Sequence, residues 1–249
     1  MKTTAVLPAS DRAIRRLTTE FFHGRVDAGH RYSGEDWFAK YAGELLALVP
    51  RGGVLLDVGC GACQITTHLS AAYDRVIAFD LSDSMLAAAR ERADLFGVTN
   101  VEICSGDASR FPASVKSADV ILANYMLQYL DGPALLAHLR ECERVLAPGG
   151  LICWGLIPNA NLRRLWYAGA LSNPRPRARH MLKAYVKTRF RWWKSERRGD
   201  SLWDNIGLWF TQDELRQVAG GMGFAVEFRN SWFYEYRFHA LLRRAADHC

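Results

Sequence analysis

The stretch Val54-Leu55-Leu56-Asp57-Val58-Gly59-Cys60-Gly61-Ala62-Cys63 decides the fold that this sequence predicts. A short apolar run ends at Asp57, and Gly59 and Gly61 break the pattern. Residues 64–69 then read as the start of a helix, so the stretch predicts a strand, a tight turn and a helix. Glycines in such a turn let the backbone approach a ligand closely, and the next helix presents unpaired N–H groups toward it. This is the geometry of a nucleotide-binding loop.

A second predicted strand, Arg75 to Phe79, is followed by Asp80, which stands 23 residues after Asp57. An acidic side chain at this place can accept hydrogen bonds from ribose hydroxyls. The turn lacks the third glycine of the dinucleotide fingerprint, since Ala62 and Cys63 follow Gly61. The ligand of this loop therefore need not carry phosphate.

Four motifs, taken together and in this order, resemble the class I S-adenosylmethionine-dependent methyltransferases. They are Leu55-Leu56-Asp57-Val58-Gly59-Cys60-Gly61, Asp80 after the second strand, Gly106-Asp107-Ala108 after the third, and Leu146-Ala147-Pro148-Gly149-Gly150 before the fifth. The resemblance covers Tyr32 to Ile157 and resumes from Phe210 to Glu227. It implies an α/β, Rossmann-like, doubly wound fold, with a seven-stranded, mostly parallel sheet, an antiparallel last strand and helices on both faces. Cys63 departs from the family pattern, because a third glycine is usual there.

The resemblance also implies S-adenosyl-L-methionine as the cofactor. Leu81 and Met85 would lie beside the adenine ring. Asp107 would accept a hydrogen bond from the exocyclic amine, and the Ala108 backbone would meet the ring edge. The full set of expected cofactor-binding residues is Asp57, Gly59, Cys60, Gly61, Asp80, Leu81, Met85, Gly106, Asp107, Ala108 and Asn124.

The loop after the fourth strand, Asn124 to Tyr129, should face the transferred methyl group, because ligands of open α/β sheets bind outside the carboxyl ends of the strands. It is not the Asn-Pro-Pro-Tyr type of motif that many methyltransferases of nucleobase or amide nitrogen use at this place. That difference argues against those substrates.

Periodicity and capping signals predict the other elements. Helices are expected over 10–22 and over 35–49, the second capped by Ser33. Asp131 should cap a helix over 134–146, residues 148–150 should turn into the fifth strand, and a Thr211-x-x-Glu214 capping box should open a helix that ends at Ala219. The remaining expected strands are 101–104, 118–123, 151–157, 223–228 and 233–242.

The chain has 249 residues, of which 49% are hydrophobic, and this favours one domain with a full core. We expect a single domain, 1–249, made of a helical cover (1–50), a cofactor-binding core (51–158), an insertion (159–205) and a last helix with the final strands (206–249). No run approaches the ~20 apolar residues of a membrane span, and no secretory signal is visible at the N-terminus. The expectation is a cytoplasmic protein, with peripheral membrane contact left open.

Cys60 and Cys63 form a Cys-x-x-Cys, which could be a redox pair or half of a zinc site. The chain has six cysteines but no second motif of this kind, and a zinc site normally needs four ligands. The glycine turn already accounts for the position, so no metal is predicted.

The insertion, Asn159 to Asn205, carries the basic charge of the protein. It has 12 Lys and Arg against 3 acidic residues, a balance of +9, while the rest of the chain balances at −3. Basic residues interleaved with tryptophan suit an anionic small acceptor, an anionic membrane surface or RNA. They also suit a solvated helical lid whose aromatic residues pack on the domain. We expect this segment to be a lid over the substrate.

Methyl transfer from a sulfonium is an in-line displacement by a lone pair of the acceptor. The enzyme contributes chiefly by holding both partners in near-attack geometry, which is worth up to ~7–11 kcal/mol. A hydroxyl acceptor needs a general base, whereas an amine or a carboxylate needs it less. The candidate catalytic residues are His23, His30, Tyr32, Tyr125 and His180.

The sequence thus predicts methyl transfer to oxygen or nitrogen of a small or lipid-linked metabolite. RNA, bound by the basic insertion, is the alternative acceptor, and a cofactor-binding protein without transfer activity is a third reading.

Overall fold

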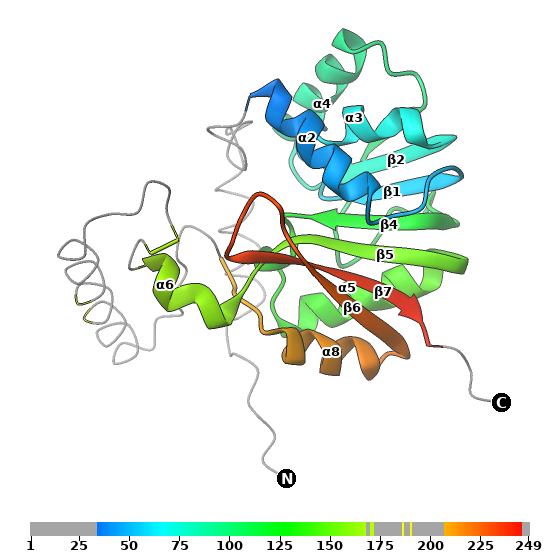
Figure 1. Ribbon diagram of the computed structural model, residues 1–249. Coiled ribbons are helices and arrows are strands. Elements are labelled where there is room, and N and C mark those ends of the chain that lie inside the picture. Colours follow the sequence, from blue (N-terminus) through cyan, green and yellow to red (C-terminus); the bar gives the residue numbers. More distant parts are fainter. Residues whose placement is uncertain (1–33, 168–169, 172–185, 187–189, 191–206, 246–249) are drawn as a thin grey trace.

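A single seven-stranded sheet forms the centre of the molecule. The computed structural model describes residues 34–167, 170–171, 186, 190 and 207–245 (Figure 1). Strand order is β3-β2-β1-β4-β5-β7-β6. Strands β1 to β5 run parallel, and β7 is antiparallel to both of its neighbours, β5 and β6. The strands are β1 (Val54–Val58), β2 (Arg75–Asp80), β3 (Val101–Ser105), β4 (Ala118–Asn124), β5 (Leu146–Pro158), β6 (Phe224–Asn230) and β7 (Arg237–Arg244).

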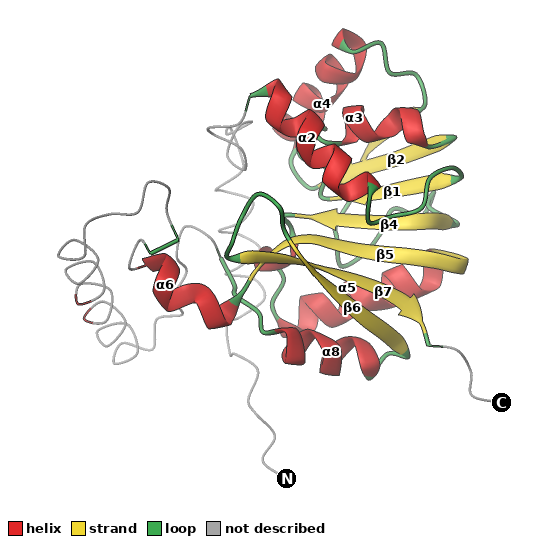
Figure 2. Cartoon of the chain, in the orientation of Figure 1, coloured by secondary structure: helices red, strands yellow, loops and turns green. Residues whose placement is uncertain are grey.

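Helices cover both faces of this sheet (Figure 2). Tyr41 of α2 shares a buried cluster with Leu122 of β4, while Leu139 of α5 and Leu215 of α8 share another with Ile121. Neighbouring residues of a strand point to opposite faces, so α2 lies on one face and α5 and α8 on the other. The described helices are α2 (Glu35–Leu46), α3 (Thr66–Leu69), α4 (Asp83–Leu95), α5 (Gly132–Val145), α6 (Arg163–Tyr167) and α8 (Gln212–Gly220). The expected doubly wound α/β fold is confirmed.

Side chains predicted to cap helices do so in α5 and α8. The Asp131 carboxylate accepts a hydrogen bond from Ala134 N at 3.0 Å, with Pro133 in the first turn. Thr211 and Glu214 form the reciprocal capping box, because the Thr211 hydroxyl accepts from Glu214 N at 3.1 Å and the Glu214 carboxylate accepts from Thr211 N at 2.8 Å. Both caps satisfy N–H groups that a helix start leaves unpaired.

The fifth strand begins earlier than predicted, at Leu146 instead of Leu151, and the predicted turn at 148–150 is an irregularity inside it. Leu146 pairs with Ala118 of β4, and the pairing is irregular before Val120. Gly149 lies inside this stretch at φ 76°. Its left-handed conformation, which glycine adopts without strain, lets the strand bend there instead of ending.

The last strand begins four residues later than predicted, at Arg237. Phe233 lies outside the strand and packs edge-on against α2. Its ring centroid is 5.5 Å from that of Trp37 and 5.9 Å from that of Tyr41. Burial of this ring against α2 outweighs the local strand propensity. The predicted helix over 10–22 lies outside the described residues. The predicted Ser33 cap is wrong, because the N-cap of α2 is Gly34, and no side chain among the described residues caps this helix start.

None of the helices that the structure describes combines the length and the hydropathy needed to cross a bilayer.

Candidate functional site

The glycine loop between β1 and α3 lies at the carboxyl edge of the sheet. Gly59 and Gly61 both have positive φ, 72° and 56°. A Cβ on Gly59 would stand 2.9 Å from the Met126 side chain, so that position also needs a glycine for space. Cys63 has φ 56° as well, although it stands where a glycine is usual in the resembled family. The left-handed conformation of a residue with a side chain costs about 1–2 kcal/mol, so this loop carries local backbone strain.

The two cysteines of this loop are free thiols. A hydrogen bond with Cys63, together with burial, raises the pKa of Cys60 well above its ordinary value, so its thiol stays protonated. Among the residues that the structure describes, no group of three or more His, Cys, Asp or Glu side chains could hold a metal ion.

Asp80, at the end of β2, joins the glycine loop to the start of α4. Its carboxylate accepts a hydrogen bond from Gly61 N at 2.9 Å and another from Ser82 N at 2.9 Å. Burial raises the pKa of Asp80, and the backbone N–H groups of Ser82, Gly61 and Leu81 partly offset that effect. A half-buried carboxylate beside the turn is a suitable acceptor for hydroxyl groups.

Asp57 has a more interior setting than the other predicted cofactor residues. Its side chain is 3% exposed and accepts a hydrogen bond from the Thr66 hydroxyl at 2.6 Å, across the loop. Burial raises the pKa of Asp57 to about 6, the Thr66 hydrogen bond opposes the rise, and the charge of Asp80 adds to it. This bond ties the end of β1 to the first residue of α3 and so fixes the width of the glycine loop.

The third predicted motif, Gly106-Asp107-Ala108, follows β3 at the same edge. The Asp107 carboxylate accepts from both Ser109 N and the Ser109 hydroxyl, at 2.8 and 2.7 Å. A Cβ on Gly106 would lie 2.7 Å from Phe79 and from Pro112, so the turn closes only with glycine. Of the two residues expected beside an adenine ring, Leu81 is 47% exposed and Met85 is buried.

His138 of α5 holds this third motif by a hydrogen bond to its backbone, and the sequence alone did not point to this residue. Its Nδ1–H donates to Ala108 O at 2.9 Å, and its Nε2 accepts from Trp154 Nε1–H at 3.2 Å. Complete burial lowers the pKa of His138 to about 4, so the ring is neutral and this tautomer is the one that satisfies both partners.

The end of β4 presents Asn124 and Tyr125. The Tyr41 hydroxyl of α2 donates to Asn124 Oδ1 at 2.5 Å. A Cβ on Gly155 of the neighbouring β5 would lie 2.4 Å from the same oxygen. Tyr125 turns away at φ 59°, with its N–H donating to Gly155 O at 3.0 Å, and the Arg237 guanidinium lies 4.0 Å from the centre of its ring.

The structure therefore gathers the predicted motifs of β1, β2, β3 and β4 along one edge of the sheet. Burial raises the pKa of the candidate base Tyr125 above its ordinary value, and the charge of Arg237 partly offsets that effect. The other candidate catalytic residues, His23, His30, Tyr32 and His180, lie outside the described residues, as does most of the 159–205 insertion.

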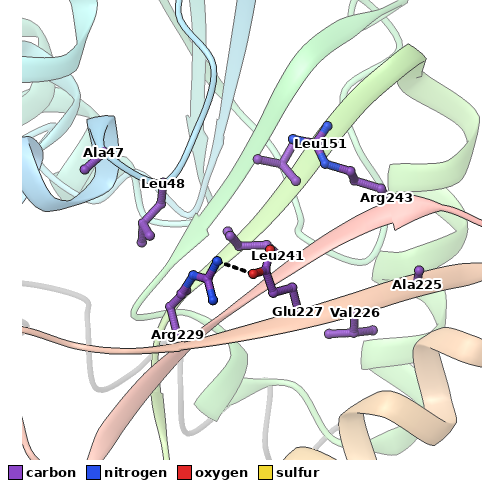
Figure 3. Close-up of a pocket in the computed structure, with 9 residues that line it drawn as sticks. All are labelled: Ala47, Leu48, Leu151, Ala225, Val226, Glu227, Arg229, Leu241 and Arg243. Carbon is purple, nitrogen blue, oxygen red and sulfur yellow. Dashed lines mark ion pairs between the residues drawn. The ribbon is translucent and has the colours of Figure 1, made fainter.

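A cavity of about 300 Å³ lies elsewhere, beneath the end of α2 and over β5, β7 and β6 (Figure 3). Arg229 and Glu227, which form an ion pair, are among the residues that line it. Its other lining residues are Ala47, Leu48, Leu151, Ala225, Val226, Leu241 and Arg243, none of which belongs to the glycine loop or to the ends of β2, β3 and β4.

Comparisons with known proteins relate part of the chain to methyltransferases. Residues 55–150 match a family model described as a methyltransferase domain. The malonyl-[acyl-carrier protein] O-methyltransferase of Pectobacterium atrosepticum is 34% identical over 125 residues, which is 49% of this chain and 46% of the relative. The demethylmenaquinone methyltransferase of Staphylococcus epidermidis is 32% identical over 107 residues, 42% of this chain and 43% of the relative. The chain thus aligns with about half the length of these curated relatives.

Solved structures show the same fold at low identity. The DhpI–SAM–HEP complex matches with a TM-score of 0.65 at 18% identity, over 94% of this chain and 100% of the other. Magnesium protoporphyrin IX methyltransferase from Synechocystis PCC 6803 with bound SAH matches with a TM-score of 0.62 at 14% identity, over 93% of this chain and 100% of the other.

Proposed function

We propose that the chain is a class I S-adenosylmethionine-dependent methyltransferase, which transfers a methyl group from S-adenosyl-L-methionine to a small or lipid-linked acceptor; the matched methyltransferase domain and the named relatives support this. The observation that carries the proposal is the hydrogen bond between Asp80 and Gly61 N. It holds an acidic side chain and an N–H-rich glycine turn side by side, which suits a nucleoside with two ribose hydroxyls.

We assign the cofactor-binding roles along the edge as follows. The Asp80 carboxylate would exchange part of its backbone hydrogen bonding for the ribose hydroxyls. The adenine ring would lie between Leu81 and the Gly106–Ala108 turn, with Asp107 accepting from its amine. Asp57 and His138 would not contact the cofactor but would hold the turns that do. Both are buried; Asp57 is hydrogen-bonded to Thr66 after the glycine loop, and His138 to the Ala108 carbonyl.

The methyl group would then point toward Asn124 and Tyr125 at the end of β4. No covalent intermediate is needed, since the acceptor lone pair displaces the sulfur directly. The chain's contribution is to hold the two reactants in line, and the bond from Tyr41 to Asn124 fixes one wall of that site. We propose that the 159–205 insertion closes over the acceptor, since it leaves the core at Asn159 and returns at Phe210, beside the same edge.

Two curated relatives support an acceptor that is small or carried on a larger group, because one is named for malonyl-[acyl-carrier protein] and the other for demethylmenaquinone. The proposal does not extend to either compound. Oxygen and nitrogen both remain acceptor atoms within it.

The test measures cofactor binding and transfer separately. Calorimetry with S-adenosylhomocysteine should show binding to the wild type, and Asp80→Ala should weaken it by about 10- to 100-fold, because hydrogen bonds to a charged group contribute about 1.5–3 kcal/mol. Asp83→Ala, an exposed carboxylate three residues further on, is the matched control and should bind normally. Equal affinity of all three proteins would remove Asp80 from the site.

Transfer is followed with labelled methyl into fractionated cell extract. Label in the organic-soluble fraction with the wild type, and none with Asp80→Ala, supports the small or lipid-linked acceptor. Label in RNA, with affinity that falls steeply as salt is added, would favour the nucleic-acid alternative. Tight binding without transfer to any fraction would favour a cofactor-binding protein.

A further inference from the structure

Arg237 is a buried charge at the ligand edge of the sheet. It is the first residue of β7 and pairs with Pro158 at the carboxyl end of β5. Because β7 is antiparallel to β5, its beginning lies at the edge where β4 ends in Asn124. The Arg237 side chain is only 3% exposed.

One nitrogen of the guanidinium is fully used in fixing its position. The NH1 group donates to Gln128 Oε1 at 2.9 Å and to the carbonyl oxygen of Leu156. The planar group lies 4.0 Å from the ring centre of Tyr125 and 5.2 Å from that of Tyr236. These contacts hold the charge between two aromatic faces beside the β4 loop.

The opposite edge of the same guanidinium has no partner among the described residues. Nε is buried without a hydrogen bond there, and no described carboxylate forms an ion pair with Arg237. Glu44 is a buried carboxylate on the same face. Its Oε1 accepts from Trp232 N at 2.6 Å and lies 3.2 Å from His239 Nε2, while its Oε2 has no hydrogen-bond partner among the described residues. A buried guanidinium without a counter-charge is unfavourable, and the edge formed by Nε and NH2 matches two oxygens of a carboxylate or phosphoryl group.

We propose that Arg237 binds an anionic oxygen group, carboxylate or phosphoryl, of the methyl acceptor. This inference rests on the proposed function and specifies its acceptor class. The ion pair between Arg237 and this anionic group orients the acceptor, and Arg237 takes no part in making or breaking bonds.

The rings around Arg237 indicate the rest of this acceptor. Tyr236 stands 6.0 Å from Trp209 and 5.8 Å from Trp166, measured between ring centres, so an aromatic wall continues outward from the guanidinium. Such a wall favours a flat, unsaturated body next to the anionic group.

The experiment compares anionic probes with uncharged ones that carry the same aromatic ring. Binding of benzoate, phenyl phosphate, benzamide and phenol to the full chain is measured by calorimetry in the presence of S-adenosylhomocysteine. The wild type should bind at least one of the two anions about tenfold or more tightly than its uncharged partner, as expected for a charge-assisted, bidentate contact. The better anion distinguishes a carboxylate site from a phosphoryl site.

The Arg237→Gln variant should bring the anion and its uncharged partner to within about twofold of one another, because an amide lacks the charge. Arg243→Gln, at the exposed far end of the same strand, is the matched control and should keep the full preference. A wild type that binds benzamide as tightly as benzoate and phenol as tightly as phenyl phosphate, or an Arg237→Gln variant with an unchanged preference, overturns the proposal.

Folding and cofactor binding are read independently. If Arg237→Gln does not fold, Arg237→Lys takes its place, since lysine keeps the charge but loses the planar fork. A preference reduced about threefold or more then supports the bidentate contact, and an unchanged one overturns it. Failure of S-adenosylhomocysteine to bind the wild type would refute the proposed function, while the anion preference would still be measurable without it.

Discussion

Replacing Asp57 by asparagine should stabilise the protein at neutral and alkaline pH. Burial raises the pKa of this carboxyl from 3.8 to about 6, so above pH 6 the folded state must hold a buried, ionised group. The folded pKa lies above the unfolded one. The associated stability is therefore fully present below pH 3.8 and is lost as pH rises through 6.

The magnitude follows from that shift. Each pKa unit corresponds to 1.36 kcal/mol, so ionised Asp57 lowers the free energy of unfolding by about 3 kcal/mol at pH 8. Asparagine has nearly the same shape, carries no charge, and its amide oxygen can still accept from the Thr66 hydroxyl. The advantage of Asp57→Asn should be about 3 kcal/mol at pH 8 and roughly half that at pH 5.

Urea unfolding of wild type and variant at pH 8, 6.5 and 5 measures this difference directly. Asp94→Asn, at an exposed position of α4, is the control and should change stability by less than about 0.5 kcal/mol at every pH. An Asp57→Asn protein that is no more stable than wild type at pH 8, or whose advantage is the same at pH 5, would refute the buried-charge argument.

Two further predictions concern glycine positions and acid stability. Gly155→Ala should destabilise the protein by about 2 kcal/mol or more and reduce transfer, because its Cβ would stand 2.4 Å from Asn124 Oδ1. Gly43→Ala in α2, where a Cβ meets nothing within 4 Å, should instead stabilise the protein by about 0.5–1 kcal/mol, and equal melting temperatures of the two variants would contradict this. Burial lowers the pKa of His138 to about 4, so its contribution to stability is complete above pH 6.5 and is lost as pH falls toward 4. In acid unfolding, the wild type should therefore lose about 3 kcal/mol more than His138→Gln between pH 6.5 and pH 4. Parallel acid-unfolding curves of the two proteins would speak against this.

The sheet and the glycine loop could be predicted because their signals are local. Residues 54–63 alone indicate strand, turn and helix, and Asp80 follows its own strand directly. Even Cys63, the departure from the family pattern, takes the positive φ that the loop requires.

Arg237 and His138 could not be predicted, because their roles depend on residues far away in the chain. Arg237 meets Gln128, 109 residues earlier, and His138 meets the Ala108 carbonyl, 30 residues earlier. The sequence signal for Arg237 is a charged residue at the start of an apolar strand, Arg237-Phe238-His239-Ala240-Leu241. Its partners become apparent only once β7 is inserted between β5 and β6.

The bridge between Asn159 and Phe210 has a consequence for how such a protein can change. Ala160 N donates to Phe210 O, and Phe210 N donates to Pro158 O, each at 2.9 to 3.0 Å, so the chain leaves the core and re-enters it at one place. A segment whose two ends meet can be lengthened, shortened or exchanged without shifting any strand, since the cost of closing a loop grows only slowly with its length. Under the proposed function, a change in this segment would alter the acceptor while the glycine loop and the end of β2 stay in place.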